Sequence, residues 1–346
     1  MRLSSIRPFT SDPLSPTTAV TEDQRDHPVV ALLRQRRAQR SAPRERTDGR
    51  TVALVIEGGG MRGVVSAGMT AAIEQLGFTN AFDEIHGASA GAFNAAFMIA
   101  SQATYLTALY AHGFGNPRFV NAARVLRGGA PFDMDYVVHE VWRSQRPLRT
   151  ERIIASPIAL HCTATDTATA QIVDLTDLRS DAEIRTALLA SARLPWLAGG
   201  PVSFKGMRLL DATLAEAVPV HVAHTTATDL LVLQTRPHGV AHQPLPGWLG
   251  NLTDRYLMGI NPQLVELRRT RSARYDVLVA QLAREASDRH AHPAVCVIRP
   301  PAGSPPVGQM EVRASRMAMA GGYGFRTAWM ALEGSDPELI NAPTAV

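Results

Sequence analysis

The sequence predicts an α/β protein with a mostly parallel central sheet that is covered by helices on both faces. Apolar runs with the length of buried strands, such as 52–56 and 230–234, alternate along the chain with segments whose apolar residues recur at helical spacing. Two glycine-flanked turns, at 58–63 and 87–91, each join an apolar run to a helical pattern. Alternation of this kind places strands side by side in parallel and helices across them.

The first 50 residues are predicted to be a basic, partly disordered segment that contains a short docking helix. Residues 1–27 are rich in Ser, Thr and Pro and show no period, which is typical of disorder. Four apolar residues between 29 and 33 precede a basic run at 34–40, and this pattern predicts an amphipathic helix. Ten Arg against six Asp or Glu give this segment a net charge of +4, which equals that of the whole chain. The remainder is therefore close to neutral.

Two strand–turn–helix units open the next segment. The strand at 52–56 leads into the first glycine-rich turn, and apolar residues at helical spacing predict a helix over 64–76 that Gly77 ends. A shorter strand at 82–86 leads into the second turn. The small residues at 90–100 predict a helix that packs closely on the sheet.

The pattern weakens from 113 to 149, where glycines, prolines and scattered aromatic residues occur. We interpret this stretch either as a mobile cap over a site or as an ordinary surface excursion. The later elements are predicted as a hairpin-like strand pair at 158–164 and 171–175, a helix at 181–191, a strand at 208–210 that ends at Asp211, a strand at 230–234, a helix at 264–286, a strand at 294–298 and a closing helix at 313–332.

Composition narrows the class of protein. The hydrophobic share of 45% and the charged share of 19% are ordinary for a globular chain. No interleaving of arginine with aromatic residues indicates nucleic-acid readout, so no nucleic-acid partner is expected. Cys162 and Cys296 lie in apolar runs and are predicted to be reduced core thiols without metal-ligand spacing.

No apolar stretch has transmembrane length, and the N-terminus lacks the apolar region of a secretory signal. We therefore expect a cytoplasmic protein. The basic first segment leaves peripheral contact with the inner membrane face as an option, against the simpler interpretation of a solvated arm. The sequence makes no prediction of the oligomeric state.

The turn Gly87-Ala88-Ser89-Ala90-Gly91 has the pattern of an exposed nucleophilic serine. A strand that ends in a sharp Gly-x-Ser-x-Gly turn and passes directly into a helix projects the serine hydroxyl. The hydroxyl then lies at a helix N-terminus, where the dipole favours developing negative charge.

The turn Gly58-Gly59-Gly60-Met61-Arg62-Gly63 offers backbone N–H groups that can hold an oxyanion. Taken alone, such a turn also fits a phosphate or dinucleotide loop. Both turns, however, fall at the carboxyl ends of neighbouring strands, where open α/β sheets place their sites. Together they favour a serine acyl hydrolase.

Ser89 needs a general base, and the residues leave two choices. His221 or His224 would complete a Ser…Asp…His order with Asp211, as in a triad. Asp211 ends an apolar run at a strand's carboxyl edge, so it could take the proton directly if an apolar site raises its pKa. Asp211 also fits a simple cap of the next turn.

Three segments resemble the patatin-like phospholipases, particularly their bacterial members. They are ALVIEGGGMRGVVSAG at 53–68, HGASAGAFNAA at 86–96 and ASARLPWLAGGPVSFKGMRLLDATLAEAVPV at 190–220. The resemblance covers residues 50–225, with a weaker likeness to 335. It implies a three-layer α/β/α sandwich, a catalytic core at 51–225 continued by 226–346 in the same domain, a lipid or acyl-ester substrate, and no metal or organic cofactor.

The resemblance also implies roles for individual residues. Ser89, flanked by Gly87 and Gly91, is the nucleophile, and Asp211 is the general base of a Ser–Asp dyad. The oxyanion hole is the turn formed by Gly58, Gly59, Gly60, Met61, Arg62 and Gly63, in which the N–H groups of Gly59, Gly60 and Met61 are the expected donors. Arg62 occupies the family's basic position, and a salt bridge that fixes the loop is the alternative role.

One position departs from the family pattern. The family usually has Gly after the catalytic Asp, whereas this chain has Asp211-Ala212-Thr213. If that Gly serves a positive φ, Ala212 imposes strain of about 1 kcal/mol or more. If it serves close packing, a methyl group is tolerated. The alternatives to a lipid acyl hydrolase are therefore a weak or inactive lipid-binding relative and a Ser-His-Asp esterase.

Aromatic residues of 113–149 are candidates for an acyl groove, and they fit an ordinary core equally well. Basic residues of the first segment would add attraction to anionic headgroups. The aromatic candidates are Phe114, Phe119, Phe132, Tyr136 and Trp142, and the basic ones are Arg34, Arg36, Arg37 and Arg40.

Overall fold

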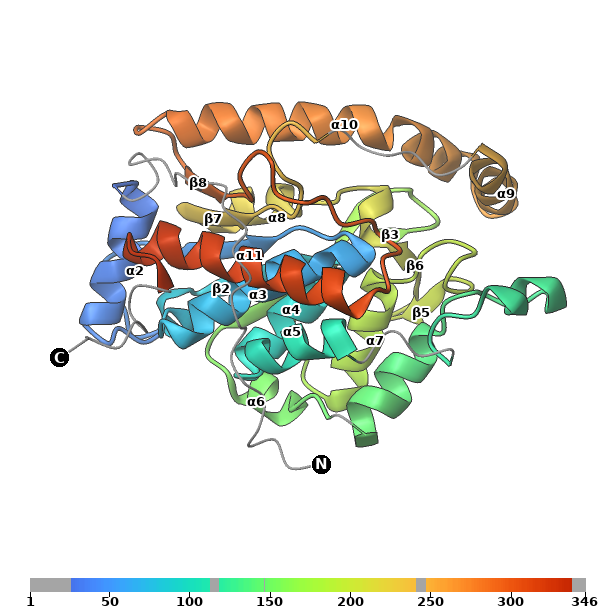
Figure 1. Cartoon of the computed structure of the whole chain (residues 1–346), viewed down its shortest axis with the longest axis horizontal. Coiled ribbons are helices and arrows are strands. Elements are labelled where there is room, and N and C mark those ends of the chain that lie inside the picture. Colours follow the sequence, from blue (N-terminus) through green and yellow to red (C-terminus); the bar gives the residue numbers. More distant parts are fainter. Residues whose placement is uncertain (1–25, 113–117, 146, 241–246, 338–346) are drawn as a thin grey trace.

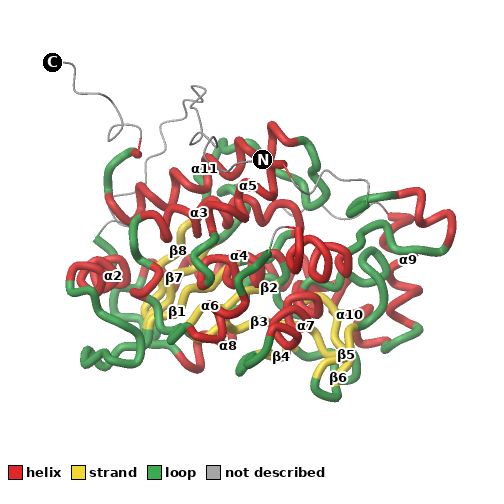
Figure 2. The backbone as a smooth tube through the Cα atoms, turned by 90° about the horizontal axis from the view of Figure 1, so that it is seen from below, coloured by secondary structure: helices red, strands yellow, loops and turns green. Residues whose placement is uncertain are grey.

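An eight-stranded sheet with helices on both faces forms the centre of the part of the chain that the structure describes (Figures 1 and 2). The structure is a computed structural model that describes residues 26–112, 118–145, 147–240 and 247–337. The strand order is β5-β6-β3-β2-β1-β7-β8, with β4 paired to β3. The strands are β1 (Val52–Ile56), β2 (Glu84–Ala88), β3 (Ala159–Asp166), β4 (Ile172–Leu175), β5 (Val202–Phe204), β6 (Met207–Asp211), β7 (Asp229–Leu233) and β8 (Ala294–Ile298).

The strands from β3 through β2, β1 and β7 to β8 are all parallel. β1 is buried along its whole length because its two faces belong to different cores. Leu54 and Ile56 pack in the larger core under one helical layer. Ala53 and Val55 pack against the opposite layer. This arrangement confirms the predicted α/β/α sandwich with a mostly parallel sheet.

The two faces of the sheet are covered by different sets of helices (Figure 2). The layer on the larger core contains α3 (Gly63–Gln75), α4 (Ala90–Ile99), α5 (Ala103–His112), α7 (Asp181–Ser191) and α11 (Ala314–Glu333). The other layer contains α8 (Val220–Thr226) and α10 (Pro262–Ser287). The remaining helical segments are α2 (Pro28–Ala38), α6 (Thr150–Ala155), α9 (Gly247–Met258), the 3-10 turns η2 (Gly60–Arg62), η3 (Thr79–Ala81), η4 (Ala122–Arg127) and η6 (Ala212–Leu214), and the π-helix η5 (Tyr136–Gln145).

Strand β6 runs toward the carboxyl end of β2, and this brings the turn that contains Ser89 close to Asp211. Cys162 of β3 pairs with β2 on one side and with β4 on the other. Two positions further along β3, Ala164 pairs with β4 and with Asp211 of β6. Because the two partners of a sheet residue lie on opposite sides, β2 and β6 share the same edge of β3 and approach each other. Their carboxyl ends, Ala88 and Asp211, therefore meet.

Helix α2 docks on the body, as the pattern of 29–33 predicts. Val29, Val30 and Leu33 are fully buried. The helix begins after His27, whose side chain accepts a hydrogen bond from the backbone N–H of Val29, with Pro28 in the first helical turn. The disorder predicted for residues 1–25 lies outside the described residues.

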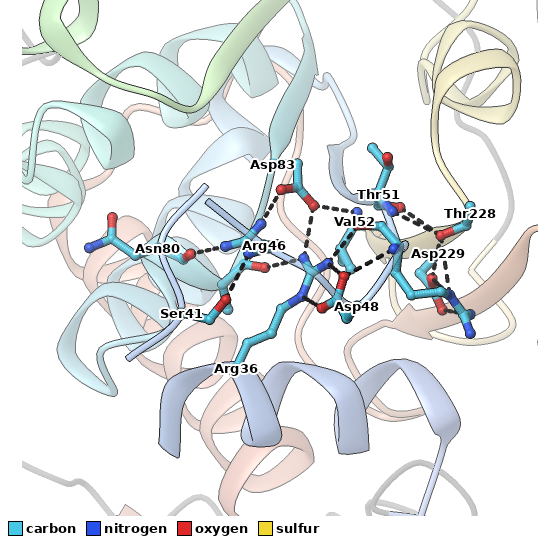
Figure 3. A network of polar contacts seen from close by, with 12 residues as sticks. Arg36, Ser41, Arg46, Asp48, Thr51, Val52, Asn80, Asp83, Thr228 and Asp229 are labelled. Carbon is cyan, nitrogen blue, oxygen red and sulfur yellow. Dashed lines mark hydrogen bonds and ion pairs between the residues drawn. The ribbon is translucent and has the colours of Figure 1, made fainter. Parts of the chain in front are cut away.

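Arg36 of α2 points toward Asp48 and Asp83 (Figure 3). Its guanidinium is 1% exposed and lies 2.8 Å from carboxylate oxygens of both Asp48 and Asp83. Arg37 is ion-paired with Glu333. The expectation that these two arginines attract anionic headgroups is therefore wrong, because their charges are neutralised within the fold.

The predicted elements agree with the structure with few shifts. β2 begins and ends two residues later than the predicted strand at 82–86, whereas α7 occupies the predicted 181–191. Helices α5, α6 and α9, the short strand β5 and the π-helix η5 were not predicted. Among the described residues, no helix combines the length and the apolar character needed to cross a bilayer.

Candidate active site

Ser89 lies at the tight turn between β2 and α4, in the position of a strand–turn–helix nucleophile. Its backbone has φ 53° and ψ −119°, a left-handed conformation that is strained for a residue with a Cβ and that occurs at such turns. Its backbone N–H donates to Ser191 Oγ at 2.8 Å. Ser191 is the last residue of α7, and helical periodicity alone gave no sign of this contact.

The glycines of the serine turn permit very close packing. A Cβ at Gly91 would lie 2.2 Å from the carbonyl oxygen of Ile56, the last residue of β1. A Cβ at Gly87 would lie 2.5 Å from the backbone of Ala92. Larger residues at either position would move α4 away from the sheet and displace Ser89.

Asp211 accepts a hydrogen bond directly from the Ser89 hydroxyl, with 2.8 Å between Oγ and Oδ2. Its other carboxylate oxygen accepts the Thr213 backbone N–H at 2.8 Å, and Thr165 Oγ1 donates to its carbonyl at the same distance. Asp211 is fully buried. This burial raises the pKa of Asp211 above its ordinary value, although the bonds from Thr213 and Ser89 and the positive charge of Arg271 act in the other direction.

Neither histidine of the alternative triad reaches Ser89. His221 lies 2.7 Å from Glu216 Oε1 with an exposed side chain, and His224 lies 3.4 Å from Glu285. Both belong to α8, as the sequence around Pro219 predicts. The structure therefore pairs Ser89 with a carboxylate and leaves the histidines with other partners.

Ala212 creates no backbone strain. It begins η6 and is absent from the described non-glycine residues with positive φ. Its methyl group is fully buried. The methyl group of Ala212 is therefore tolerated in place of the family's usual glycine, and the contact between Ser89 and Asp211 is intact.

The glycine-rich turn places Gly59 and Gly60 at the cavity that Ser89 lines. The Gly58 N–H donates to the carbonyl of Ala217 at 2.8 Å, and the Met61 N–H donates to the carbonyl of Gln309 at 3.0 Å. For the N–H groups of Gly59 and Gly60, the described part of the chain offers no hydrogen-bond partner, and both residues line the same cavity as Ser89. The expectation that the Met61 N–H donates to the oxyanion is therefore wrong, because this N–H bonds to Gln309 and holds the loop in place.

Arg62 holds the glycine-rich turn in place through contacts with Thr235 and Glu57, which is the alternative role expected for it. Its Nε donates to Thr235 Oγ1 at 2.9 Å, and its guanidinium lies 3.5 Å from the buried carboxylate of Glu57. Glu57 also accepts the backbone N–H of Thr235 and the hydroxyl of Tyr275. Gly63 follows the loop and packs against α4, since a Cβ there would lie 2.6 Å from that of Ala90.

A cavity of about 510 Å³ surrounds Ser89, within the range of roughly 300–1,000 Å³ found for ligand pockets. Of the predicted groove residues, Phe119, Phe132 and Trp142 line it. Tyr136 instead lies beneath the Arg118 guanidinium, and Phe114 lies outside the described residues. Further apolar walls come from Phe93, Met134, Val137, Leu194 and Leu197, and α10 adds Arg268, Arg269, Arg271 and Ser272.

One buried group of side chains has the composition of a metal site. Among the described residues, Glu84, His86 and His161 hold potential ligand atoms within 4.8 Å of one another. His86 lies 3.0 Å from Glu84, and His161 lies 2.7 Å from Asp174. Because these groups already bond to one another, we treat them as a hydrogen-bonded cluster and propose no metal there.

The fold and the site define an α/β protein in which a serine at one strand end lines a largely apolar cavity beside a glycine-rich turn and bonds to a buried aspartate from a second strand end. Residues 54–224 match the family model Patatin-like phospholipase. The chain therefore carries a patatin-like phospholipase domain, as its three motifs indicate.

The similar proteins are distant. "Uncharacterized protein YjjU" of Escherichia coli (strain K12) is 30% identical over 212 residues, which cover 58% of this chain and 57% of YjjU, so this chain spans little more than half the length of that relative. The crystal structure of VipD from Legionella pneumophila matches with 10% identity and a TM-score of 0.43, over 83% of this chain and 67% of VipD. A structure of SpcU with ExoU from Pseudomonas aeruginosa matches with 14% identity and a TM-score of 0.30, over 88% of this chain and 73% of the matched one.

Proposed function

We propose that this protein is a serine acyl hydrolase that cleaves ester bonds of lipids. The observation that carries the proposal is the 2.8 Å hydrogen bond from Ser89 Oγ to the buried carboxylate of Asp211, with Ser89 at the wall of a largely apolar cavity. A carboxylate whose pKa is raised by burial is a stronger base than an exposed one, and it contacts the proton that must leave. The patatin-like domain supports the same activity.

The proposed reaction has two halves. Ser89 Oγ attacks the ester carbonyl carbon while its proton passes to Asp211, and the oxyanion is stabilised by the N–H groups of Gly59 and Gly60. The intermediate then collapses, and the departing alcohol takes the proton from Asp211. Water attacks the acyl-enzyme with Asp211 again as the base. Release of the fatty acid returns the proton to Ser89.

The cavity walls supply the remaining requirement, a site for an acyl chain. Phe93 and Trp142 pack edge to face with ring centroids 4.6 Å apart, and both line the cavity with Phe119 and Phe132. Such walls bind hydrocarbon and exclude water from the acyl ester. We further propose a cytoplasmic location with peripheral membrane contact. Cys162 and Cys296 are both buried in the core.

A substrate panel tests the proposal. Purified protein is assayed on esters that run from short p-nitrophenyl esters to monoacylglycerols and phospholipid vesicles. We expect hydrolysis to rise with acyl-chain length and to increase above the critical micelle concentration, because longer chains bury more apolar area in the cavity. Activity confined to short soluble esters would reduce the proposal to a carboxylesterase. Ligand binding without hydrolysis of any ester would favour a lipid-binding protein instead.

Gly60→Ala tests the oxyanion donors. Gly60 has φ 58°, and a Cβ there would lie 2.7 Å from the Gln309 carbonyl oxygen, so the substitution must shift the loop. We expect kcat to fall by about tenfold or more, with a smaller change in KM, because the lost contact is made to the oxyanion. Steady-state kinetics on a soluble ester measure both constants.

Gly77→Ala is the matched control. Gly77 also has positive φ, at 75°, but it follows α3 and an added Cβ would meet nothing within 4 Å. This variant should lose about 1 kcal/mol of stability, the same backbone cost, without a change in kcat. Equal kcat values for the two variants would remove the turn from the catalytic proposal.

A further inference from the structure

Helix α10 brings a cationic side to a cavity whose other walls are apolar. The apolar walls come from α4, from residues 119–142 and from the segment after α7, whereas Arg268, Arg269, Arg271 and Ser272 come from α10. Figure 1 shows α10 and the green segment that contains η5 on opposite sides of the sheet. A ligand that fills the cavity therefore meets hydrocarbon at one end and arginine at the other.

The three arginines differ in what they bind. Arg268 and Arg269 both form ion pairs with Asp254, the latter at 3.0 Å. Arg271 is partly buried, and within the described residues no group accepts a hydrogen bond or ion pair from it. Arg271 is therefore the arginine of this wall whose guanidinium is available to a ligand.

The surroundings of Arg271 favour an added negative charge. Burial is the largest cause that lowers its pKa, to about 10, and the charges of Arg236, Arg62 and Arg274 act in the same direction. The carboxylate that opposes them, Asp211, already accepts hydrogen bonds from Ser89 and Thr213. Arg271 thus stays charged at neutral pH in an environment with excess positive charge.

The neighbouring cations are not among the described residues that line the cavity. Arg62 bonds to Thr235 and lies 3.5 Å from Glu57. Arg274 donates to backbone carbonyls, including that of Leu267 at 2.8 Å, and Arg236 lies over the Tyr275 ring. These arginines are held within the fold, so Arg271 is the member of the group that a substrate can engage.

We propose that Arg271 binds an anionic group, a phosphate or a carboxylate, carried by the alcohol part of the ester substrate. The inference rests on the proposed hydrolase function and extends it to the substrate class. With the acyl chain along the aromatic walls and the ester at Ser89, the alcohol part faces α10. Two parallel N–H donors of a guanidinium match two oxygens of a phosphate or carboxylate. The preferred substrate is then an acylglycerol phosphate rather than a neutral acylglycerol.

A binding experiment tests the subsite without catalysis. Glycerol 3-phosphate and succinate are titrated separately into the full-length Ser89→Ala protein by calorimetry. We expect glycerol 3-phosphate to bind, and Arg271→Gln in the same background to weaken it by about tenfold to a hundredfold, as for the loss of a charged hydrogen bond. Tighter binding of succinate would identify a carboxylate ligand. Equal binding of glycerol 3-phosphate with and without Arg271 would overturn the proposal.

A kinetic experiment then links the subsite to specificity. The ratio of kcat/KM for an acylglycerol phosphate to that for a monoacylglycerol with the same acyl chain is measured for each variant. Arg271→Gln should lower this ratio by about tenfold or more, and Arg271→Lys should restore part of it. Arg284→Gln removes the same charge from an exposed position of α10, and its ratio should equal that of the wild type.

Two outcomes separate the proposals. If Arg271→Gln lowers kcat/KM equally on both substrates, Arg271 acts through Asp211. That result would overturn the proposed anion subsite but leave the hydrolase function standing. A wild-type protein that hydrolyses neither ester would contradict the hydrolase function. The calorimetric titration would still decide whether Arg271 binds an anion.

Discussion

Replacement of Ser89 by Ala is expected to abolish ester hydrolysis. The variant removes the nucleophilic oxygen that lies 2.8 Å from Asp211, and no acyl-enzyme can then form. The unfolding free energy should change by less than about 1 kcal/mol, because one oxygen contributes little packing at this turn. Hydrolysis of p-nitrophenyl esters and covalent labelling by a fluorophosphonate probe are the measurements. Wild-type protein should label, and Ser89→Ala should not.

Ser203→Ala is the matched control for this experiment. Ser203 is exposed in strand β5, and the same substitution there should leave both hydrolysis and labelling unchanged. Residual activity in Ser89→Ala at the wild-type level would place the nucleophile elsewhere. Labelling of wild-type protein without turnover would point to a blocked second half-reaction.

Replacement of Asp211 by Asn is expected to lower kcat by a factor of about 10² or more, because the proton acceptor of Ser89 is lost. The amide can still accept the Thr213 N–H that now bonds to Oδ1, so the local turn should persist. Steady-state kinetics give kcat. Fluorophosphonate labelling should slow in parallel, because it depends on the same proton transfer.

The pKa of Asp211 gives this prediction a pH dependence. Since burial raises this pKa above 3.8, wild-type activity should fall as the pH decreases through the raised value, and Asp211→Asn should lack this acid limb. Between 3.8 and the raised value the folded state holds a proton that the unfolded chain has lost, so stability falls as the pH rises through this window. Asn removes that buried charge. At neutral pH the variant should therefore unfold at the same or a higher temperature than the wild type.

Histidine variants are the control for the identity of the base. His221→Ala and His224→Ala should each cost less than about tenfold in kcat, because these side chains bond to Glu216 and Glu285 rather than to Ser89. A dead histidine variant would replace the dyad by a Ser-His-Asp triad.

The sequence by itself determined the elements that depend on local pattern. The run VALVI identified β1 because a strand buried on both faces must be apolar at every position. Helical spacing identified α3, α7 and α10. Patterns were weaker where burial is partial, so α5, α9 and the π-helix η5 were missed. The bounds of β2 were shifted by two residues, because this fully buried strand contains the polar residues Glu84 and His86.

The sequence also identified Ser89 and Asp211 as candidates, since a strained turn and a strand end each leave a local signature. Only the tertiary structure decided that the two meet. Their contact depends on β6 approaching β2 along the same edge of β3, and pairing between strands so far apart in the chain leaves no local pattern. The same holds for the donation of the Met61 N–H to Gln309.

The sequence likewise did not predict which arginines are paired with carboxylates and which face the cavity. The basic pattern at 34–40 suggested a surface, yet Arg36 is buried between two carboxylates. Arg271, which no motif distinguished, faces the reaction cavity without a partner among the described residues. An arginine has the same charge wherever it lies in the chain. Whether that charge stabilises the fold or is available to bind a ligand depends on which carboxylates the folded chain places close to it.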